Sequence, residues 1–191
     1  MLLCADPARA ARDLAARQLA CPSCGQGRLR PWGHARERVI WLLGGATARL
    51  APPRGRCTSC PATHVLLPSW CVPQRPHGIE VIATAAGAAV SGAGHRAIAA
   101  DLGVPPATVR GWLRRLRSRA EQLRAYAARQ LGSIDPHAEP PSPAGSPLAD
   151  ALGALAAAVH AARRIGHDPQ STWPLLGTLG LSRHLAPAPG G

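Results

Sequence analysis

The chain contains no lysine and no phenylalanine, and it has few aromatic or acidic residues. All 22 of its basic residues are arginines, against 10 acidic residues, and its 191 residues carry a formal net charge of +12. Aromatic residues make up only 3% of the chain, so its core is thin, and a bound metal is one source of further stability. The positive charge suits a polyanionic partner. Because this alanine-rich and proline-rich composition is also typical of high-GC coding, the positions of the arginines are more informative than their number.

Long apolar runs are also missing. The first residues, MLLCADPARAARD, show neither a basic leader nor a sustained apolar segment, and the longest weakly polar segment, residues 79–90, is too short to cross a bilayer. We therefore expect a cytoplasmic, nucleoid-associated protein with no membrane contact. Structural disulfides are rare in that compartment, so the six cysteines are expected to serve other purposes.

Four of the cysteines occur as two Cys-x-x-Cys pairs, Cys21/Cys24 and Cys57/Cys60. Two thiolates on one tight turn bind a cation from the same side, and a second such turn completes a tetrahedron. In a reducing compartment the pattern predicts one structural Zn²⁺ bound by all four cysteines. The interval between the pairs leaves room for short strands, predicted at residues 28–32, 39–43 and 48–52, with another at 65–67 and turns at Gly44-Gly45 and Pro52-Pro53.

The remaining cysteines and the nearby histidines are not predicted to be ligands. Cys4 lies alone before a helical pattern and is interpreted as a free thiol, and Cys71 as a buried thiol near Trp70. His34 and His64 each lack a partner at ligand spacing, so we interpret them as surface or core residues.

Residues 95–117, HRAIAADLGVPPATVRGWLRRLR, predict two short helices joined by a tight turn. Apolar residues recur at helical spacing before Gly103 and again after Pro105-Pro106. Glycine reaches the left-handed conformation that ends a helix, and proline is favoured at the start of the next helix. The second helix then turns its arginines outward and buries four apolar residues: Val109, Trp112, Leu113 and Leu116.

An exposed arginine face on such a helix pair is suited to the major groove of DNA. The residues expected to contact DNA form two groups: base-edge contacts from Thr108, Arg110 and Arg114, and phosphate contacts from His95, Arg96, Arg115 and Arg117. Nine arginines against three acidic residues between positions 75 and 131 concentrate the positive charge on this unit. The alternative is an ordinary helical hairpin whose arginines form a solvated face.

Supporting elements are predicted on both sides of the helix pair. A helix capped by Asp6 is expected over residues 6–19, a further helix over 78–91, and a helical pattern continues from Arg119 to Leu131. The C-terminal helix, residues 148–164, is expected either to pack on the other helices or to pair with its copy in a homodimer, and the final residues are expected to be disordered. The predicted divisions are an N-terminal helix (1–20), a zinc ribbon (21–72), a DNA-binding domain (73–131), a linker (132–147), and a C-terminal helix and tail (148–191).

The cysteine pairs, the segment RCTSCPATHVLLPSW, the segment HGIEVIA and the motif RAIAADLGVPPATVRGWL together resemble a family of small zinc-ribbon and helix-turn-helix proteins of high-GC bacteria. The same stretch, about residues 20–130, resembles the DNA-binding end of insertion-sequence transposases, and the helix pair resembles that of sigma-factor-like regulators. Residue patterns and resemblance agree on an α+β fold: a small Cys4 zinc ribbon of short antiparallel strands, then an all-α three-helix helix-turn-helix unit and a C-terminal helix. The resemblance implies binding of double-stranded DNA at inverted-repeat ends or at an operator.

The chain departs from transposases after the helix pair, because the acidic residues beyond position 131 are few: Asp135, Glu139, Asp150 and Asp168. Transposases need three metal-binding carboxylates on a catalytic domain, which these last residues do not supply. We therefore predict a sequence-specific DNA-binding protein, a regulator or a transposase-derived accessory protein, that is not an enzyme. The alternative is a zinc-ribbon protein-interaction adaptor without specific DNA binding. The ribbon either braces the helices only or also touches DNA, through Arg28, Arg30, Arg36, Arg38, Arg54 and Arg56.

Overall fold

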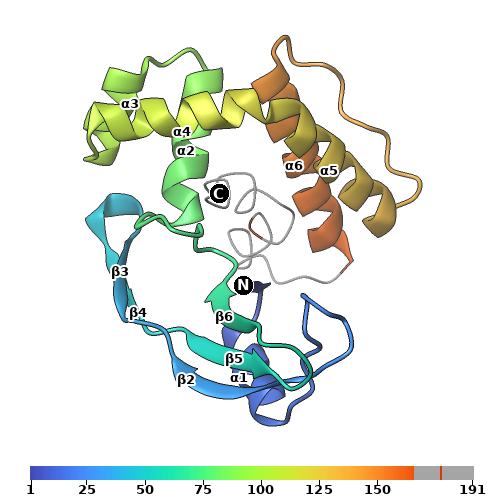
Figure 1. Cartoon of the computed structure of the whole chain (residues 1–191). Coiled ribbons are helices and arrows are strands. Elements are labelled where there is room, and N and C mark those ends of the chain that lie inside the picture. Colours follow the sequence, from blue (N-terminus) through green and yellow to red (C-terminus); the bar gives the residue numbers. More distant parts are fainter. Residues whose placement is uncertain (166–176, 178–191) are drawn as a thin grey trace.

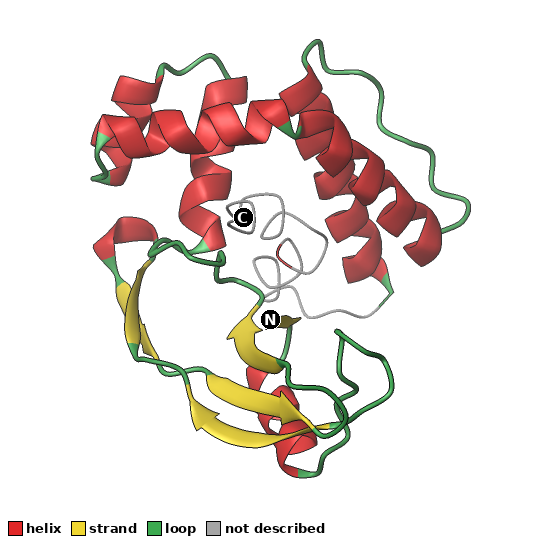
Figure 2. Ribbon diagram, in the orientation of Figure 1, coloured by secondary structure: helices red, strands yellow, loops and turns green. Residues whose placement is uncertain are grey.

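A computed structural model describes the fold of residues 1–165 and of residue 177. The fold is α+β, as predicted, and its strands and long helices are segregated along the chain (Figure 1, Figure 2). The described strands all lie within residues 2–68, which we call the strand half, and residues 79–164 form the helical half. The predicted disordered tail and Asp168 lie outside the described residues.

The strand half combines two small sheets with one helix and one 3₁₀ turn. Its elements are β1 (Leu2–Cys4), α1 (Pro7–Ala15), β2 (Leu29–His34), β3 (Arg38–Trp41), η1 (Leu43–Gly45), β4 (Thr47–Leu50), β5 (Pro53–Cys57) and β6 (Thr63–Pro68). One sheet has the strand order β1-β6-β5-β2, and β3 and β4 pair separately as an antiparallel hairpin. Strand β1 runs parallel to β6, whereas β6, β5 and β2 are antiparallel neighbours.

Helix α1 closes the small core of the strand half. It begins where predicted, because the Asp6 carboxylate accepts a hydrogen bond from the Arg9 amide at 2.9 Å and Pro7 occupies the first turn. It ends at Ala15, earlier than predicted, since Arg17 has a φ of 56°, outside the helical region. The buried residues of this core are Ala10, Leu14, Cys21, Leu29, Cys57 and Leu66.

Strands β2, β3, β4 and β6 confirm the predictions, with ends displaced by one or two residues. Strands β1 and β5 were not predicted. The prediction of a turn at Pro52-Pro53 is wrong, because Pro53 begins β5, which pairs with β2 on one side and β6 on the other. Proline is tolerated as the first residue of a strand, where a missing N–H costs the ladder little.

The helical half contains α2 (Ile79–Val90), α3 (His95–Leu102), α4 (Pro106–Ser118), α5 (Ala120–Ile134) and α6 (Pro147–Arg164). Helices α2, α3 and α4 pack on one another, and α5 packs along α6. All five contribute to one apolar core, in which Trp112 is the only aromatic side chain among the buried members. Among the described residues, no helix is both long and apolar enough to span a membrane.

The turn between α3 and α4 forms where predicted. Gly103 has a φ of 65° and ends α3, and Pro105 and Pro106 begin α4. A side chain at Gly103 would meet no neighbouring atom, so the left-handed backbone is what favours glycine there. Helix α4 buries the four apolar residues predicted for it.

The helical pattern that continued past residue 118 is interrupted at Arg119. Its φ of −119° and ψ of 9° lie outside the helical range, so α4 ends and α5 begins as a separate helix. Figure 1 shows α5 turning away from α4 to run beside α6. Of the two roles predicted for the C-terminal helix, packing within the chain is therefore observed.

The two halves meet where the β3–β4 hairpin touches the segment that leads into α2. The Trp41 amide donates to the Pro76 carbonyl at 2.7 Å, and the Gly78 amide donates to the Trp41 carbonyl at 2.8 Å. The Leu43 amide donates to a carboxylate oxygen of Glu80, in the first turn of α2, at 2.9 Å. These bonds attach the hairpin to the start of the helical half.

Candidate metal centre and basic helix face

The four cysteines of the two Cys-x-x-Cys pairs lie together, with all their sulfur atoms within 4.8 Å of one another. The Sγ atoms of Cys21 and Cys60 are 3.8 Å apart, and those of Cys24 and Cys57 are 3.7 Å apart. Disulfide sulfurs lie about 2.05 Å apart, so none of these is bonded. Four sulfurs placed tetrahedrally at about 2.3 Å from a cation lie about 3.8 Å apart. The cluster therefore has the dimensions of a four-thiolate metal site.

Backbone amides point at the sulfurs and favour their ionised form. The amides of Ser59 and Cys60 lie 3.3 Å and 3.4 Å from the Sγ atom of Cys57. Hydrogen bonds from these amides, first that of Ser59, outweigh burial and lower the pKa of Cys57 to about 6. Hydrogen bonds from backbone amides, first that of Gly27, likewise lower the pKa of Cys24. Each Cys-x-x-Cys turn, which we call a knuckle, thus favours a thiolate, which is the form that binds metal.

The sulfur atoms also compete with one another. The Ala62 amide lowers the pKa of Cys60, but burial and the neighbouring thiols together raise it to about 12. Four thiolates at these distances repel one another, so they are all ionised only when a cation balances their charge.

Gly27 is a residue of this site that sequence reasoning missed. A Cβ atom at this position would lie 2.5 Å from the Sγ atom of Cys57 and 2.7 Å from the Ser59 hydroxyl. The Gly27 carbonyl accepts a hydrogen bond from the Cys21 amide at 2.8 Å, which closes the first knuckle. The backbone of one knuckle thus passes against a ligand of the other at a distance that only glycine allows. Its place three residues after Cys24 was the available signal.

His64 is a second residue of this site whose position beside the cysteines the sequence did not reveal. Its side chain is only 5% exposed, and its Nε2 atom lies 3.5 Å from the Sγ atom of Cys21 and 3.4 Å from the Ser23 hydroxyl. Burial lowers the pKa of His64, so the neutral ring is favoured. A neutral imidazole that donates from Nε2 stabilises a thiolate without adding a ligand.

The other candidates lie elsewhere. Cys4 belongs to β1, where burial raises the pKa of its half-buried thiol. Cys71 is buried, as predicted, and packs with Ile40 and Leu67, with Trp70 beside them. His34 is exposed at the end of β2.

Helix α4 presents a basic face opposite its buried one. Arg110, Arg114 and Arg117 follow one another at spacings of four and three residues, so they form one stripe along the helix, and all three are exposed. Arg96, on α3, is exposed as well. None of these four side chains pairs with a carboxylate of the described residues, since the ion pairs found there involve other arginines.

The remaining residues of the predicted DNA-contacting set are half-buried: Thr108, Arg115 and His95. Arg115 lies on the flank of α4, where burial and then the charges of Arg75, Arg119 and Arg114 lower its pKa. The sequence pattern assigned Arg115 to the same outer surface as Arg114, whereas the structure places it between that surface and the core.

Comparison with known proteins adds one similarity. Residues 21–112 match the profile of a protein family that is described as a domain of unknown function (DUF6431). The match covers just under half of the chain, and it runs from the first cysteine of the cluster into α4. The matched segment thus includes residues 21–68 of the strand half and the α3–α4 turn, and it leaves out β1 and α1. No curated protein and no solved structure matches the chain.

Proposed function

We propose that the protein binds double-stranded DNA in a sequence-specific manner, through a helix-turn-helix formed by α3 and α4 and supported by α2. The observation that carries this proposal is the stripe of Arg110, Arg114 and Arg117, whose guanidiniums have no carboxylate partner among the described residues. The opposite face of α4 is buried, so the stripe is held on a rigid element. Unpaired guanidiniums on a rigid helix suit the phosphates and guanine edges of a major groove.

Within this proposal the residues divide by exposure and position. Arg110 and Arg114, with Thr108, read base edges near the start and middle of α4. Arg117 and Arg96, with His95 and Arg115 at the rim, contact phosphates. Phosphate contacts fix the position of the helix on the duplex, and base contacts supply specificity.

The strand half is proposed to be a zinc ribbon. Four thiolates in a tetrahedron are the donor set and geometry that Zn²⁺ prefers, and the sulfur spacings above fit it. With four protein ligands the site has no open position for water or substrate, so zinc there stabilises the fold and catalyses nothing. We accordingly propose a DNA-binding regulator or transposase-derived accessory protein, acting in the cytoplasm as a monomer or homodimer, and no enzyme.

The first test is a selection from random duplexes with the zinc-loaded protein, followed by titrations of the enriched site at several salt concentrations. We expect one enriched motif and a steep fall of affinity with salt. Arg114→Ala should weaken binding to that motif by about 1–3 kcal/mol and relax its specificity. Arg117→Ala should weaken binding to all duplexes alike and flatten the salt dependence.

Arg12→Ala is the matched control, because it removes one exposed arginine from α1 in the strand half. The proposal would be wrong if all three variants lost the same affinity on every duplex: Arg114→Ala, Arg117→Ala and Arg12→Ala. Such a result would mean that only the overall positive charge matters.

A protein-interaction adaptor is the second candidate, and one observation favours it. Val39 and Trp41 alternate along β3, so they share one face, and they are 39% and 49% exposed. Exposed apolar side chains that lie together are typical of docking surfaces. The adaptor predicts no enriched DNA motif, and Trp41→Ala would then abolish capture of a protein partner without affecting zinc binding.

A further inference from the structure

Arg30, Trp32 and Arg56 form a basic cluster on β2 and β5, which we call the Arg–Trp–Arg cluster. Arg30 and Arg56 are paired across these antiparallel strands, and Trp32 follows Arg30 on the same face. The guanidinium carbons of Arg30 and Arg56 lie over the Trp32 ring, at 5.0 Å and 4.8 Å from its centroid. Trp32 is 42% exposed, so this arrangement belongs to the surface and not to the core.

The two guanidiniums keep their hydrogen-bond donors available. Stacking on an aromatic ring uses the face of a guanidinium, so its N–H groups stay free at the edges. Among the described residues, no carboxylate pairs with Arg30 or Arg56, whereas four other arginines each have an acidic partner: Arg9, Arg49, Arg124 and Arg164. Two cations held side by side without an acidic partner are arranged for an external anion.

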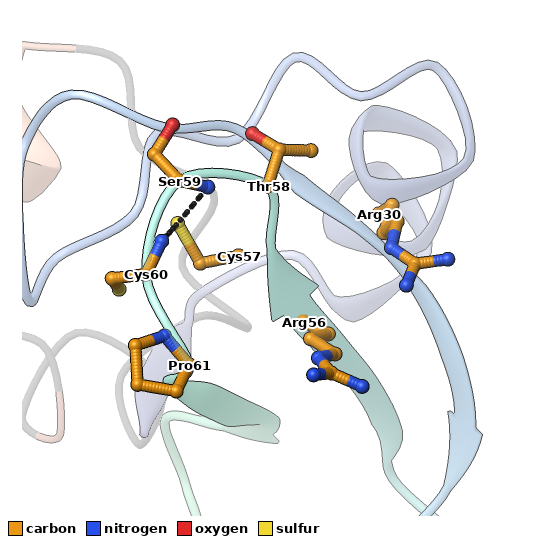
Figure 3. A pocket seen from close by; sticks show the side chains of 7 residues that line it. All are labelled: Arg30, Arg56, Cys57, Thr58, Ser59, Cys60 and Pro61. Carbon is orange, nitrogen blue, oxygen red and sulfur yellow. Dashed lines mark hydrogen bonds between the residues drawn. The ribbon is translucent and has the colours of Figure 1, made fainter.

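A shallow hollow of about 520 Å³ lies beside the cluster (Figure 3). Its lining consists of Arg30, Arg56, Cys57, Thr58, Ser59, Cys60 and Pro61. The Thr58 hydroxyl accepts a hydrogen bond from the Arg28 amide at 3.1 Å, which leaves its O–H group to donate to a further acceptor. The lining therefore includes the two guanidiniums that can bind a phosphate group, whereas in Figure 3 the Thr58 hydroxyl points away from them.

We propose that the Arg–Trp–Arg cluster is a second DNA contact, at which Arg30 and Arg56 bind phosphate groups of the duplex backbone. This inference rests on the proposed function, since it takes DNA as the partner. Both guanidiniums lie over the Trp32 ring and compete with an unpaired base for it, so a duplex backbone fits better than a single strand. Strands β2 and β5 lie at the opposite end of the molecule from α4 (Figure 1), so the cluster would contact a different stretch of a bound duplex from α4 and add to its affinity.

The cluster also borders the metal site, and this suggests a competing role. A Zn²⁺ ion with four thiolates carries a net charge of −2, and nearby guanidiniums balance such a charge. Since Cys57 and Cys60 line the same hollow, Arg30 and Arg56 would then serve the metal and not DNA. In the first role, the affinity for DNA depends on Arg30 and Arg56. In the second role, the affinity for zinc depends on them.

The experiment compares the zinc-loaded wild type with Arg30→Gln/Arg56→Gln in titrations of a 30-base-pair duplex over a range of salt concentrations. Each lost phosphate contact lowers the slope of log affinity against log salt by about 0.9, so the variant should lose a slope of about 1.8 and bind roughly 10–100-fold more weakly at 0.1 M salt. The loss should be equal on cognate and scrambled duplexes. Trp32→Ala should weaken binding in the same way without changing the net charge, because it frees the guanidiniums to move.

Arg12→Gln/Arg17→Gln removes two exposed arginines to which no DNA contact is assigned and is the matched control. Equal slopes for this control and for the cluster variant would overturn the inference. So would a weakening seen only with single-stranded DNA. Faster zinc loss to a competing chelator, with unchanged duplex affinity of the loaded variant, would assign the arginines to the metal and overturn it as well.

The same titrations with Arg110→Gln/Arg114→Gln separate this inference from the proposed function. Residual salt-dependent duplex binding in that variant, abolished by adding Arg30→Gln/Arg56→Gln, supports the second contact. If Arg110→Gln/Arg114→Gln binds every duplex like the wild type, the role proposed for α4 is wrong. The role of the cluster is then tested by the change in salt slope that Arg30→Gln/Arg56→Gln causes.

Discussion

We expect a chelator to unfold the strand half while the helical half stays folded, because the two halves have separate apolar cores. The perturbation is removal, under reducing conditions, of the zinc that we propose for the four-cysteine site. A cooperative metal site that is absent from the unfolded chain contributes its binding free energy directly to folding.

The structure sets the relative magnitudes. Two of the six buried members of the strand-half core, Cys21 and Cys57, belong to the metal cluster itself, and the large apolar side chains that remain are Leu14, Leu29 and Leu66. A second cluster of the strand half also buries Ile40 and Leu67. These five side chains contribute about 8–15 kcal/mol, whereas structural zinc contributes about 10–16 kcal/mol in zinc-finger peptides. The helical-half core instead buries three isoleucines, six leucines and Trp112, none of them near the cysteine cluster. The proposed zinc would therefore match the whole apolar contribution in the strand half and contribute nothing directly to the helical half.

The assay is amide hydrogen exchange read by mass spectrometry, before and after chelation. Residues 20–68 should lose protection, and residues 79–134 should keep it. Cys24→Ser should behave like the chelated protein, and Cys71→Ala should respond to the chelator as the wild type does, because Cys71 lies outside the cluster. Simultaneous loss of protection in both halves would refute the reasoning, since it would make the chain one cooperative unit.

Three further predictions follow from single positions. Gly27→Ala should weaken zinc binding in a chelator competition, because its Cβ would lie 2.5 Å from the Sγ atom of Cys57. The control is Gly25→Ala, which should affect stability more than zinc affinity, because its Cβ meets no neighbouring atom and its φ is 67°. Equal zinc affinities for wild type and Gly27→Ala would contradict the packing argument. Gly103→Ala should lower the free energy of unfolding by about 1–2 kcal/mol, since φ is 65° there. Gly111→Ala lies inside α4 with open space for its Cβ, and it should raise the free energy of unfolding by about 0.5–1 kcal/mol. Urea denaturation measures both changes, and shifts of the same sign would contradict the role given to the backbone conformation of Gly103. Burial lowers the pKa of His77 from 6.5, so as the pH falls the unfolded chain binds a proton before the folded protein does, and the free energy of unfolding should fall from about pH 6.5 through the lower folded pKa. His77→Phe keeps a ring against Trp112 and should remove that part of the pH dependence. An unchanged pH dependence in this variant would show that His77 does not cause it.

Local signals predicted the parts of the fold that depend on neighbouring residues. The α3–α4 turn is encoded by a glycine that must be left-handed and two prolines that start a helix, and all three lie within four positions. The cysteine pairs were likewise recognisable from spacing, and their sulfurs lie together. At such positions the chemistry of one residue type decides the conformation.

The missed elements depend on distant partners. Strand β1 has three residues and pairs with β6, more than sixty positions away, which no periodicity reveals. Strand β5, with the sequence PRGRC, has no apolar alternation, and its pairing is determined by the strands on both sides. The break at Arg119 has neither glycine nor proline, and packing of α5 along α6 accounts for it.

The site residues that escaped prediction share this origin. Gly27 and His64 come within reach of the cysteines only because the two knuckles and β6 converge. Arg30 and Arg56 are separated by 25 residues and meet over Trp32 only because β2 pairs with β5. Spacing in the sequence identifies the four cysteines, whereas the residues that surround them follow from the fold.

The junction between the halves has a consequence for how such chains can diverge. Trp41 is joined to Pro76 and Gly78 by main-chain amides and carbonyls, which nearly every amino acid supplies. The exposed side chains on the hairpin, such as Val39 and Trp41, can therefore be exchanged while the angle between the strand half and the helices is kept. Two positions are exceptions: a Cβ at Gly78 would lie 3.0 Å from the Leu42 side chain, and the carboxylate of Glu80 accepts the hydrogen bond from the Leu43 amide. A protein built in this way can acquire a new surface on its hairpin and still present α4 in the old direction.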